Sequence, residues 1–478
     1  MNPPLLCLLL MSFGALAAEP PSKPPNIVFI LADDLGWTDT GAYGSKYYET
    51  PNIDRLATQG MKFTNYHTCQ NCAPTRAALM SGQYGARTGI YTVGTTDRFD
   101  WSSRPLRPVD NLRELPSDKI TIAQALKRAG YATGIFGKWH LNEKGACHPS
   151  QRGFDEAITS MGLHFNFETQ PPVEHPPDAY LADWLTDKAG DFIRRHKDEP
   201  FFLYLPHFGV HVPLQAKEDW IVHFKSKPPV GGHHDPVYAA MIASVDESVG
   251  RVMALLDELK ISDNTVVIFS SDNGGVGGYG SKGIEKGGGI TDNAPLRSGK
   301  GSLYEGGTRV PFIVRWPGVT KPGSTCGVPA IHVDVYTTFL EIAGAAPPED
   351  YPLDGESLVP LLRDGGASLK RGAIYQHFPG YLGGGGNTWR TTPVGTIISG
   401  DWKLMEFFED GHLELYNLRD DIGETKNLAK EMPEKAKELH GKMLAWRTEI
   451  QAPMPASNSG GEPQEEKKSK NNRQEVNE

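Results

Sequence analysis

Cysteine is scarce in this sequence, which has only five in 478 residues. Cys7 lies in the apolar amino-terminal segment, so four remain in the body of the chain. Four cysteines are too few to form a disulfide framework in a chain of this length, which excludes the small cysteine-rich secreted folds. If Cys72 has another role, at most one disulfide can form among Cys69, Cys147 and Cys326, and the sequence leaves the pairing open.

Positive charge and long apolar runs are also limited. Lys and Arg number 48 against 58 Asp and Glu, which gives a net charge of −10. Because binding to nucleic acid requires a basic surface, no nucleic-acid partner is expected. After the amino-terminal segment, no stretch approaches the roughly 18 consecutive apolar residues of a membrane-spanning helix. We therefore expect no transmembrane segment in the mature protein.

Residues 1–18 have the pattern of a secretory signal peptide. Residues 5–11 form an apolar core, and residues 15–18 (Ala-Leu-Ala-Ala) offer small side chains at the expected cleavage position. The segment differs from the usual pattern because no Lys or Arg precedes the apolar core. The prediction is export to the periplasm or the extracellular space, or delivery to the lysosome if the host is an animal.

Most of the chain has the pattern of an α/β domain. Four apolar runs of strand length are separated by helical segments, and the runs are continuous enough to be buried on both faces of a sheet. The length and the 38% hydrophobic content allow a sizeable core and predict two domains. The predicted strands are Asn26–Ala32, Tyr131–Phe136, Phe201–Leu205 and Thr265–Phe269, and the predicted helices include Ile122–Ala129, Tyr180–Lys197, Tyr238–Lys260 and Val335–Ala343. We assign this domain to residues 25–345.

The pattern changes after the proline-rich linker at residues 346–352. Residues 370–450 contain short strand-like runs followed by a charged helical segment, which predicts a small antiparallel sheet with one packed helix. The strand-like runs are 395–398, 402–407 and 413–418, and the helix is 434–447. Residues 452–478 have almost no apolar side chains, which predicts a disordered tail. The glycine-dense segments 274–289 and 380–386 are predicted to be loops. The second is expected either to shape the rim of a pocket or to be a simple surface loop.

Four oxygen donors follow two of the buried strands. Asp33 and Asp34 follow the first strand, and Asp272 and Asn273 follow the last. Carboxylate and amide oxygens suit a hard divalent cation such as Ca²⁺ or Mg²⁺, whereas Zn²⁺ usually recruits His or Cys. The structural alternative is that these residues cap a helix and form a turn.

The other two strands also end in polar residues. Lys138 and His140 follow the second strand, and His207 and His211 follow the third. In open α/β sheets ligands bind beyond the carboxyl ends of the strands, so these side chains are expected to meet the acidic residues in one cleft. Each of them has an ordinary structural explanation when taken alone.

A short segment spells Cys72-Ala-Pro-Thr-Arg76. Pro74 suits the first turn of a helix that continues through residues 77–80. Cys72 would then lie at a helix amino terminus, where unpaired N–H groups favour negative charge, so even an unmodified thiol is expected to be activated. The alternative is a structural or redox cysteine, because Cys69 and Cys72 form a Cys-x-x-Cys pair.

This Cys-x-Pro-x-Arg segment resembles the maturation signature of the formylglycine-dependent sulfatase family. The resemblance extends in order over roughly residues 25–450 and includes segments that look like the family's metal, lysine and histidine motifs. They are residues 26–37 and 50–54, Gly137-Lys-Trp-His-Leu141, His211-Val-Pro213, Ser271-Asp-Asn-Gly-Gly275, residues 300–311, Gly400-Asp-Trp-Lys-Leu404 and Glu414-Leu-Tyr-Asn-Leu418.

The resemblance implies a fold and two cofactors. The expected fold is alkaline phosphatase-like, with a large mixed, mostly parallel sheet flanked by helices. A maturation enzyme of the host would oxidise Cys72 to formylglycine. The metal would be held by residue 72 together with Asp33, Asp34, Asp272 and Asn273, and Ca²⁺ is preferred over Mg²⁺.

The resemblance also implies a role for each catalytic residue. One hydroxyl of the aldehyde hydrate would attack the sulfur of a sulfate ester, giving a sulfated enzyme. Arg76, Lys138 and Lys300 would surround the sulfate oxygens, and His211, helped by Lys300, would protonate the leaving alcohol. His140 would then remove the proton of the second hydroxyl, and elimination of sulfate would regenerate the aldehyde.

The predicted substrate is a sulfate ester of a carbohydrate or, less preferred, of an aryl alcohol. His207 and His377 are predicted to line the leaving-group pocket, and Tyr381, Trp389 and Arg390 with His377 are proposed to recognise the sugar. Two alternatives stay open: a phosphodiesterase or phosphonate monoester hydrolase of the same superfamily, and a catalytically silent sulfate-binding homologue. The sequence does not distinguish the sugar, the sulfate position, exo from endo action, or the oligomeric state.

Overall fold

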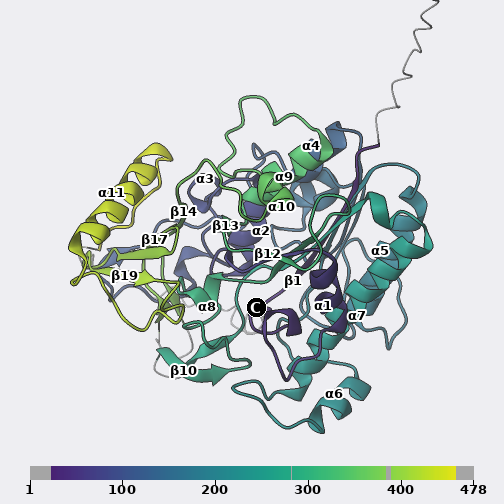
Figure 1. Cartoon of the computed structure of the whole chain (residues 1–478), viewed down its shortest axis with the longest axis horizontal. Helices are drawn as coiled ribbons and strands as arrows, with labels where there is room; N and C mark the ends of the chain where they lie inside the picture. Colours follow the sequence, from purple (N-terminus) through teal and green to yellow (C-terminus); the bar gives the residue numbers. More distant parts are fainter. Residues whose placement is uncertain (1–22, 281–282, 384–388, 459–478) are drawn as a thin grey trace, which may run out of the picture.

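The main part of the protein is a large sheet between two layers of helices (Figure 1). The computed structural model describes residues 23–280, 283–383 and 389–458. The sheet has eight strands in the order β12-β2-β11-β8-β1-β7-β5-β6. Their bounds are β1 (Asn26–Ala32), β2 (Met61–Phe63), β5 (Ala132–Gly137), β6 (Glu156–Thr159), β7 (Phe201–Pro206), β8 (Thr265–Ser271), β11 (Phe312–Arg315) and β12 (Ser324–Cys326).

The strands β8, β1, β7, β5 and β6 run parallel to one another, and β11 runs antiparallel to β8 and β2. The predicted mixed, mostly parallel sheet is therefore confirmed. The register pairs Ala32 with Ser271, so β1 and β8 end at the same level. The residues that follow these two strands must then lie side by side.

The central strand shows why the sheet is buried on both faces. Alternate residues of β1 face opposite sides, and all seven are buried. Ile27, Phe29 and Leu31 belong to one core, which α2 (Cys72–Ser81), α4 (Ile122–Arg128) and α9 (Asp334–Ala343) cover. The intervening Val28, Ile30 and Ala32 belong to the other core, which is covered by α1 (Pro51–Gln59), α5 (Leu181–His196), α6 (Glu218–Lys225) and α7 (Pro236–Glu258).

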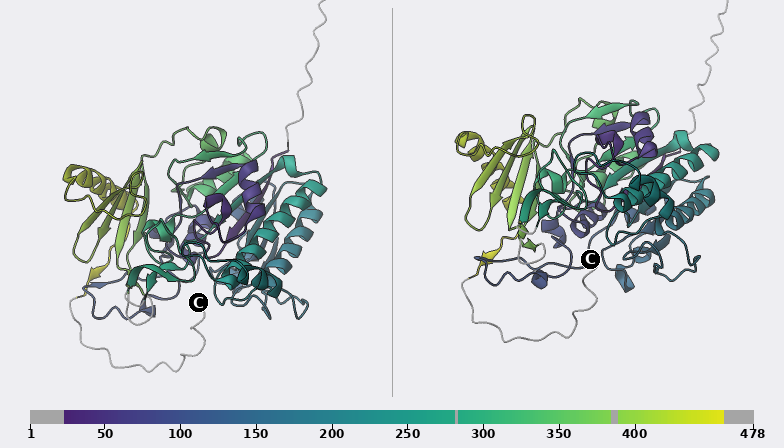
Figure 2. Two further views of the ribbon diagram at one scale, coloured as in Figure 1. Left: turned by 60° about the horizontal axis from the view of Figure 1, so that its bottom comes forward. Right: turned by 90° about the horizontal axis from the view of Figure 1, so that it is seen from below.

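A small antiparallel sheet stands beside the main domain (Figure 2). Its order is β14-β17-β18-β19, with bounds β14 (Ile374–Phe378), β17 (Val394–Ser399), β18 (Trp402–Phe407) and β19 (Leu413–Asn417). Helix α11 (Pro433–Glu449) packs on its outer face, where Leu439 and Met443 meet Ile397 and Leu404. The predicted carboxyl-terminal sheet with one packed helix is confirmed.

A buried ion network joins the small sheet to the main domain. Lys403 of β18 lies between two carboxylates, with its Nζ 2.8 Å from an oxygen of Glu305 and 2.8 Å from an oxygen of Glu424. Arg309 donates to the other oxygen of Glu305 at 2.6 Å. The side chains of Lys403, Glu305 and Glu424 are fully buried. Water cannot screen their charges, so each charge must be compensated by the others.

Two sequence predictions meet a different outcome. The glycine-dense segment 274–289 contains a hairpin of β9 (Gly277–Gly280) and β10 (Gly283–Gly289) and is not a plain loop. The predicted disordered tail is wrong at its start, because β20 (Ala456–Ser457) pairs with β4 (Leu106–Arg107). Residues 459–478 and the predicted signal peptide lie outside the described residues.

The remaining strands and α-helices are short and lie in the connections. They are β3 (Tyr66–His67), β13 (Ala330–Ile331), β15 (Leu382–Gly383), β16 (Trp389–Thr391), α3 (Gly85–Thr88), α8 (Glu305–Thr308) and α10 (Val359–Arg363). Within the described ranges, none of the helices has the length and apolar character needed to cross a membrane.

Candidate active site

The site begins where β1 and β8 end next to each other. Asp33 and Asp34 follow β1, Asp272 and Asn273 follow β8, and all four side chains are buried. The backbone N–H of Asp34 donates to Asp272 at 3.2 Å, and the Asn273 amide donates to Asp34 at 2.8 Å. The two predicted pairs of oxygen donors thus form one cluster.

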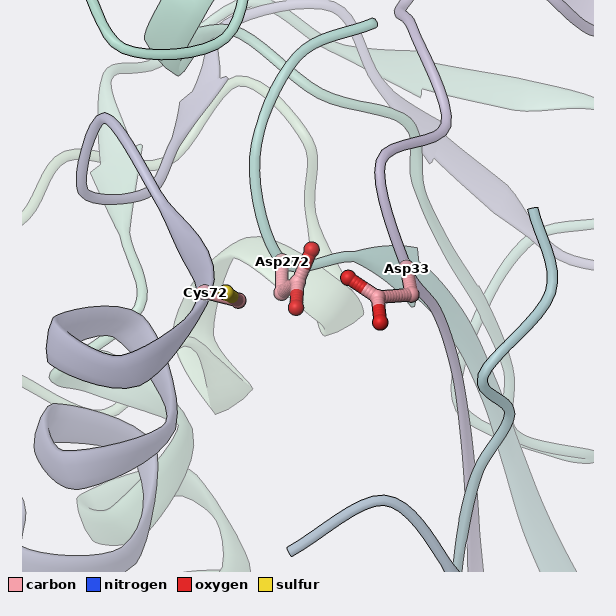
Figure 3. A group of neighbouring side chains, drawn as sticks. All are labelled: Asp33, Cys72 and Asp272. Atoms are coloured by element: carbon pink, nitrogen blue, oxygen red, sulfur yellow. The ribbon is translucent and has the colours of Figure 1, made fainter. Parts of the chain in front are cut away.

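Cys72 faces this cluster from the first turn of α2 (Figure 3). Figure 3 shows its sulfur beside Asp272, with Asp33 on the far side of that carboxylate. One ligand atom from each of the three residues lies within 4.8 Å of the other two. A second set, Asp33, Asp34 and His211, satisfies the same limit.

Two buried oxygen atoms in the cluster have no hydrogen-bond partner. They are Oδ1 of Asp33 and Oδ1 of Asn273. A buried acceptor without a partner is costly, and in a carboxylate cluster a cation satisfies it. The surrounding donors are predominantly oxygens, which suits a hard cation such as Ca²⁺ or Mg²⁺. The residues present therefore fit the metal site that the sequence predicted.

Two lysines pair with the carboxylates. Lys138 Nζ lies 2.6 Å from Oδ2 of Asp33, and Lys300 Nζ lies 2.7 Å from Oδ2 of Asp34. Burial raises the pKa of Asp33, but Lys138 and the other nearby cations outweigh it and leave that pKa well below its usual range. Burial, followed by the charge of Asp33, raises the pKa of Asp272 to about 7.

Arg76 also pairs with the carboxylates, but its side chain is buried and does not line the cavity. Its Nε and Nη2 donate to Oδ2 of Asp272 at 2.9 and 2.7 Å, and its Nη1 donates to the Lys138 carbonyl at 2.7 Å. These contacts use all three guanidinium nitrogens. The structure thus corrects the expectation that Arg76 surrounds the sulfate: its guanidinium orients Asp272.

Two histidines lie beside the cations. His211 donates from Nδ1 to the Val212 carbonyl at 2.7 Å and directs Nε2 toward Asp34, 3.7 Å away. Burial and then the charge of Lys300 lower the pKa of His211 to about 4. Burial and Lys138 likewise lower the pKa of His140, whose buried Nδ1 has no hydrogen-bond partner. Both rings are therefore neutral imidazoles in this state.

The structure corrects the expected activation of the Cys72 thiol. Burial raises the pKa of Cys72, and this effect exceeds the opposing influence of Lys138 and Lys300. An unmodified thiol here stays protonated. The Cys-x-x-Cys pair forms no disulfide, and Cys69 instead lies 3.4 Å from Nε2 of His332.

A cavity of about 540 Å³ opens onto these groups. Its inner wall carries the chemical groups Asp34, Cys72, Lys138, His140, His211 and Lys300. Its outer wall is formed by loop residues and the two-stranded sheet β15-β16, including Val93, Arg98, Phe99, Met161, Leu382, Gly383 and Arg390. The placement of the second glycine-dense segment at the pocket rim is thus consistent with Leu382 and Gly383.

The predicted sugar contacts divide into three groups. Arg390 lines the cavity, whereas Tyr381 and Trp389 do not line it and contact each other with their ring centres 5.2 Å apart and their planes tilted by 54°. His207 is buried and bonds to Ser248 Oγ at 2.8 Å, and His377 bonds to the Pro453 carbonyl at 2.8 Å. These two histidines are structural, so the expectation that they contact substrate is corrected.

The sequence did not indicate Arg98, Phe99 and Met161 as cavity residues. They lie in connections without apolar periodicity or a recognisable motif, so no sequence signal places them. Phe99 packs edge-on against Trp389 at 6.2 Å, which joins this wall to the aromatic pair.

Comparison with known proteins identifies the family. The model described as Sulfatase matches residues 25–345, and one described as N-sulphoglucosamine sulphohydrolase, C-terminal, matches residues 299–449. The chain belongs to the sulfatase family. It is accordingly a sulfuric ester hydrolase.

Individual relatives resemble this sulfatase over most of its length. A protein named Sulfatase from Formosa agariphila is 36% identical and covers 90% of each chain. The human N-acetylgalactosamine-6-sulfatase is 34% identical over 73% of this chain and 68% of its own. The crystal structure of Ps i-CgsB in complex with k-i-k-neocarrahexaose has a TM-score of 0.76 and 30% identity, covering 90% of this chain and 94% of the other.

Proposed function

We propose that this sulfatase hydrolyses sulfate esters of carbohydrates, with residue 72 matured to formylglycine and a Ca²⁺ ion held by the acidic cluster. One observation supports the proposal most strongly. Residue 72 lies at a helix amino terminus against two buried carboxylates, with Lys138 and Lys300 on the same cavity. Such an arrangement suits a nucleophile acting on an anionic ester.

The segment Cys72-Ala-Pro-Thr-Arg76, which resembles the maturation signature of the family, is the reason to propose maturation. Burial, which raises the pKa of the Cys72 thiol, is consistent with it. A protonated thiol is a poor nucleophile. A formylglycine hydrate would supply one hydroxyl to attack sulfur and a second whose deprotonation releases sulfate and restores the aldehyde. The oxidation requires a maturation enzyme of the host, because no residue of the cluster accepts electrons from a thiol.

The proposed cation site consists of Asp33, Asp34, Asp272, Asn273 and the oxygen of matured residue 72. The unpartnered oxygens of Asp33 and Asn273 support it, and Ca²⁺ is preferred because a mainly carboxylate and amide donor set suits its flexible coordination. When bound, the ion would lower the pKa of a coordinated hydroxyl and neutralise sulfate charge.

The chain's own side chains take the remaining roles. Lys138 and Lys300 line the cavity and would bind the sulfate oxygens, and Arg76 would hold Asp272 in place. His211 would give a proton to the leaving alcohol, and the anionic ester beside it favours the protonated imidazole that this requires. His140 would accept the proton of the second hydroxyl.

A carbohydrate is the proposed leaving group. The human relative is named for a sulfated sugar, and the solved relative was captured with a neocarrahexaose. The cavity wall here combines polar and apolar side chains, with Arg98 and Arg390 beside Phe99 and Met161. This mixture suits the hydroxyls and the C–H faces of a sugar.

The test measures release of sulfate from sulfated mono- and oligosaccharides, with 4-nitrophenyl sulfate and a bis(4-nitrophenyl) phosphodiester as reference substrates. We expect release from at least one sulfated sugar and little turnover of the diester. Preferred turnover of the diester would support the phosphodiesterase alternative, and no turnover of any sulfate ester by matured protein would support the silent homologue. Amino-terminal sequencing of protein from the native host tests the proposed export, which requires removal of residues 1–18.

A further inference from the structure

A second cavity lies next to the active-site cavity. It has a volume of about 640 Å³ and shares three wall residues with the first: Val93, His140 and Met161. Because His140 borders both, the second cavity begins next to the proposed site of chemistry. A ligand bound at Cys72 that extends past His140 therefore reaches the second cavity.

The second cavity differs from the first in charge. Two cations, Arg113 and Lys144, and two acids, Glu114 and Glu143, contribute to its wall, so their charges balance. By contrast, Arg98, Lys138, Lys300 and Arg390 line the active-site cavity together with one acid, Asp34. The second cavity thus lacks the positive excess that would select another sulfate.

Its lining has the groups that recognise an uncharged sugar. The Asn142 amide donates to Glu114 at 2.7 Å, which is an exposed donor and acceptor pair, and Gln170 adds a second amide. Leu112 stands on the same wall with 45% of its surface exposed. Hydroxyls bind paired amides and carboxylates, and the C–H face of a sugar packs on an exposed aliphatic side chain.

The wall that carries Leu112 is fixed in position. Asn111 accepts from the backbone N–H of Tyr91 at 2.7 Å and donates to the Gly94 carbonyl at 2.7 Å, which links the two segments of the wall. The N–H of Leu112 itself donates to the Gly89 carbonyl at 2.9 Å. A binding surface held in this way is preformed, which reduces the entropy lost on binding.

We infer that the second cavity is a subsite for a further sugar residue, so the natural substrate is a sulfated oligosaccharide or polysaccharide and not an isolated sulfated monosaccharide. This inference rests on the proposed function. The sulfated residue lies at Cys72, and its neighbour in the chain passes His140 and occupies the space beside Leu112 and Asn142.

The test blocks the subsite and leaves the chemistry untouched. Leu112→Trp fills the cavity from a partly exposed position, and Leu444→Trp on α11, 44% exposed, is the matched control outside both cavities. The probes are 4-nitrophenyl sulfate, N-acetylglucosamine 6-sulfate, a keratan sulfate tetrasaccharide whose galactose residues are unsulfated, and a κ-carrageenan hexasaccharide, in which the neighbour of the sulfated galactose is an uncharged anhydrogalactose. The readout is kcat/KM for sulfate release from each.

We expect the unaltered protein to favour one of the oligosaccharides over the monosaccharide by about tenfold or more. Leu112→Trp should lower kcat/KM for that oligosaccharide about tenfold, mainly by raising KM. Its kcat/KM for 4-nitrophenyl sulfate should stay within about twofold of that of the unaltered protein. The Leu444→Trp variant should match the unaltered protein on every probe.

Two results would overturn the inference while leaving the proposed function standing. The first is turnover of 4-nitrophenyl sulfate with no oligosaccharide preferred over the monosaccharide. The second is an oligosaccharide preference that Leu112→Trp does not change. A protein that fails on all four sulfate esters overturns the proposed function, and the subsite inference falls with it.

Discussion

Replacing Lys138 by Met tests the charge balance of the site most sharply. Lys138 Nζ lies 2.6 Å from Oδ2 of Asp33, and the two side chains are 2% and 0% exposed. Removing one partner of a buried pair leaves the other charge uncompensated, at a cost of about 3–5 kcal/mol. Arg76 stays 3.9 Å from the same oxygen and compensates in part, so we expect a loss of about 3 kcal/mol in the free energy of unfolding.

The same change removes a cavity-lining group that we propose to bind the sulfate. Loss of one donor aimed at developing charge lowers turnover by about a hundredfold to a thousandfold, so activity should fall at least that far. The double variant Lys138→Met/Asp33→Asn separates the two effects. It removes both charges and should recover most of the lost stability, but no activity, since Asp33 is a proposed metal ligand.

The assays are urea unfolding and sulfate release from the best sugar found. Lys442→Met is a matched control, because Lys442 also pairs with a carboxylate, Glu438, but on the exposed face of α11. It should change neither stability nor turnover appreciably. Near-normal turnover by Lys138→Met, or a double variant no more stable than the single one, would refute the reasoning.

Three further changes test other parts of the account. Asp272→Asn should abolish turnover and weaken calcium binding in titration calorimetry, and full activity of the unaltered protein after chelation would contradict the metal role. Lys403→Met leaves two buried glutamates facing each other and should lower the free energy of unfolding by about 4 kcal/mol; a loss below about 1 kcal/mol would show that the network is dispensable. His207→Gln addresses pH. Burial lowers the pKa of His207 from 6.5 to about 3. Between these two pH values the imidazole is protonated in the unfolded chain but neutral in the folded protein. The free energy of unfolding therefore decreases as the pH is lowered from 6.5 to about 3. The variant should lose about 2 kcal/mol less than the unaltered protein between pH 7 and 5, and an unchanged pH profile would contradict a neutral buried His207.

The sequence predicted the elements that are buried and regular. Residues 26–32 form one continuous apolar run, and the structure assigns β1 to the same residues because both faces of that strand are covered. The parallel neighbours of β1 were recognised in the same way. The strands β2, β11 and β12 were missed, since each has three or four residues and gives no readable period.

The candidate site could be located, but the direction of its side chains could not. The end of a strand places a residue near the cleft, and this logic holds for Lys138 and His211, which line it. It fails for His207, whose ring turns toward Ser248, and for Arg76, whose guanidinium turns toward Asp272. Position along the chain sets where the backbone lies, whereas neighbouring partners in the fold decide which way a long or polar side chain points.

The outer wall of the cavity was the least predictable part. Arg98 ends a one-turn 3-10 helix (Thr96–Arg98) within a long connection, and no periodicity or motif marks it. No sequence signal marks Leu112 of the second cavity either. Only the fold shows that this exposed leucine lines a cavity. Substrate recognition by loops on a rigid scaffold is therefore read from the structure.

The mass of the peptide that contains residue 72, measured in active protein from its native host, tests the central claim most directly. The account predicts an aldehyde or its hydrate at that position, in proportion to the specific activity of each preparation. An intact thiol in fully active protein would contradict it, because the proposed reaction needs one hydroxyl of an aldehyde hydrate to attack sulfur and a second to release sulfate, and a thiol supplies neither.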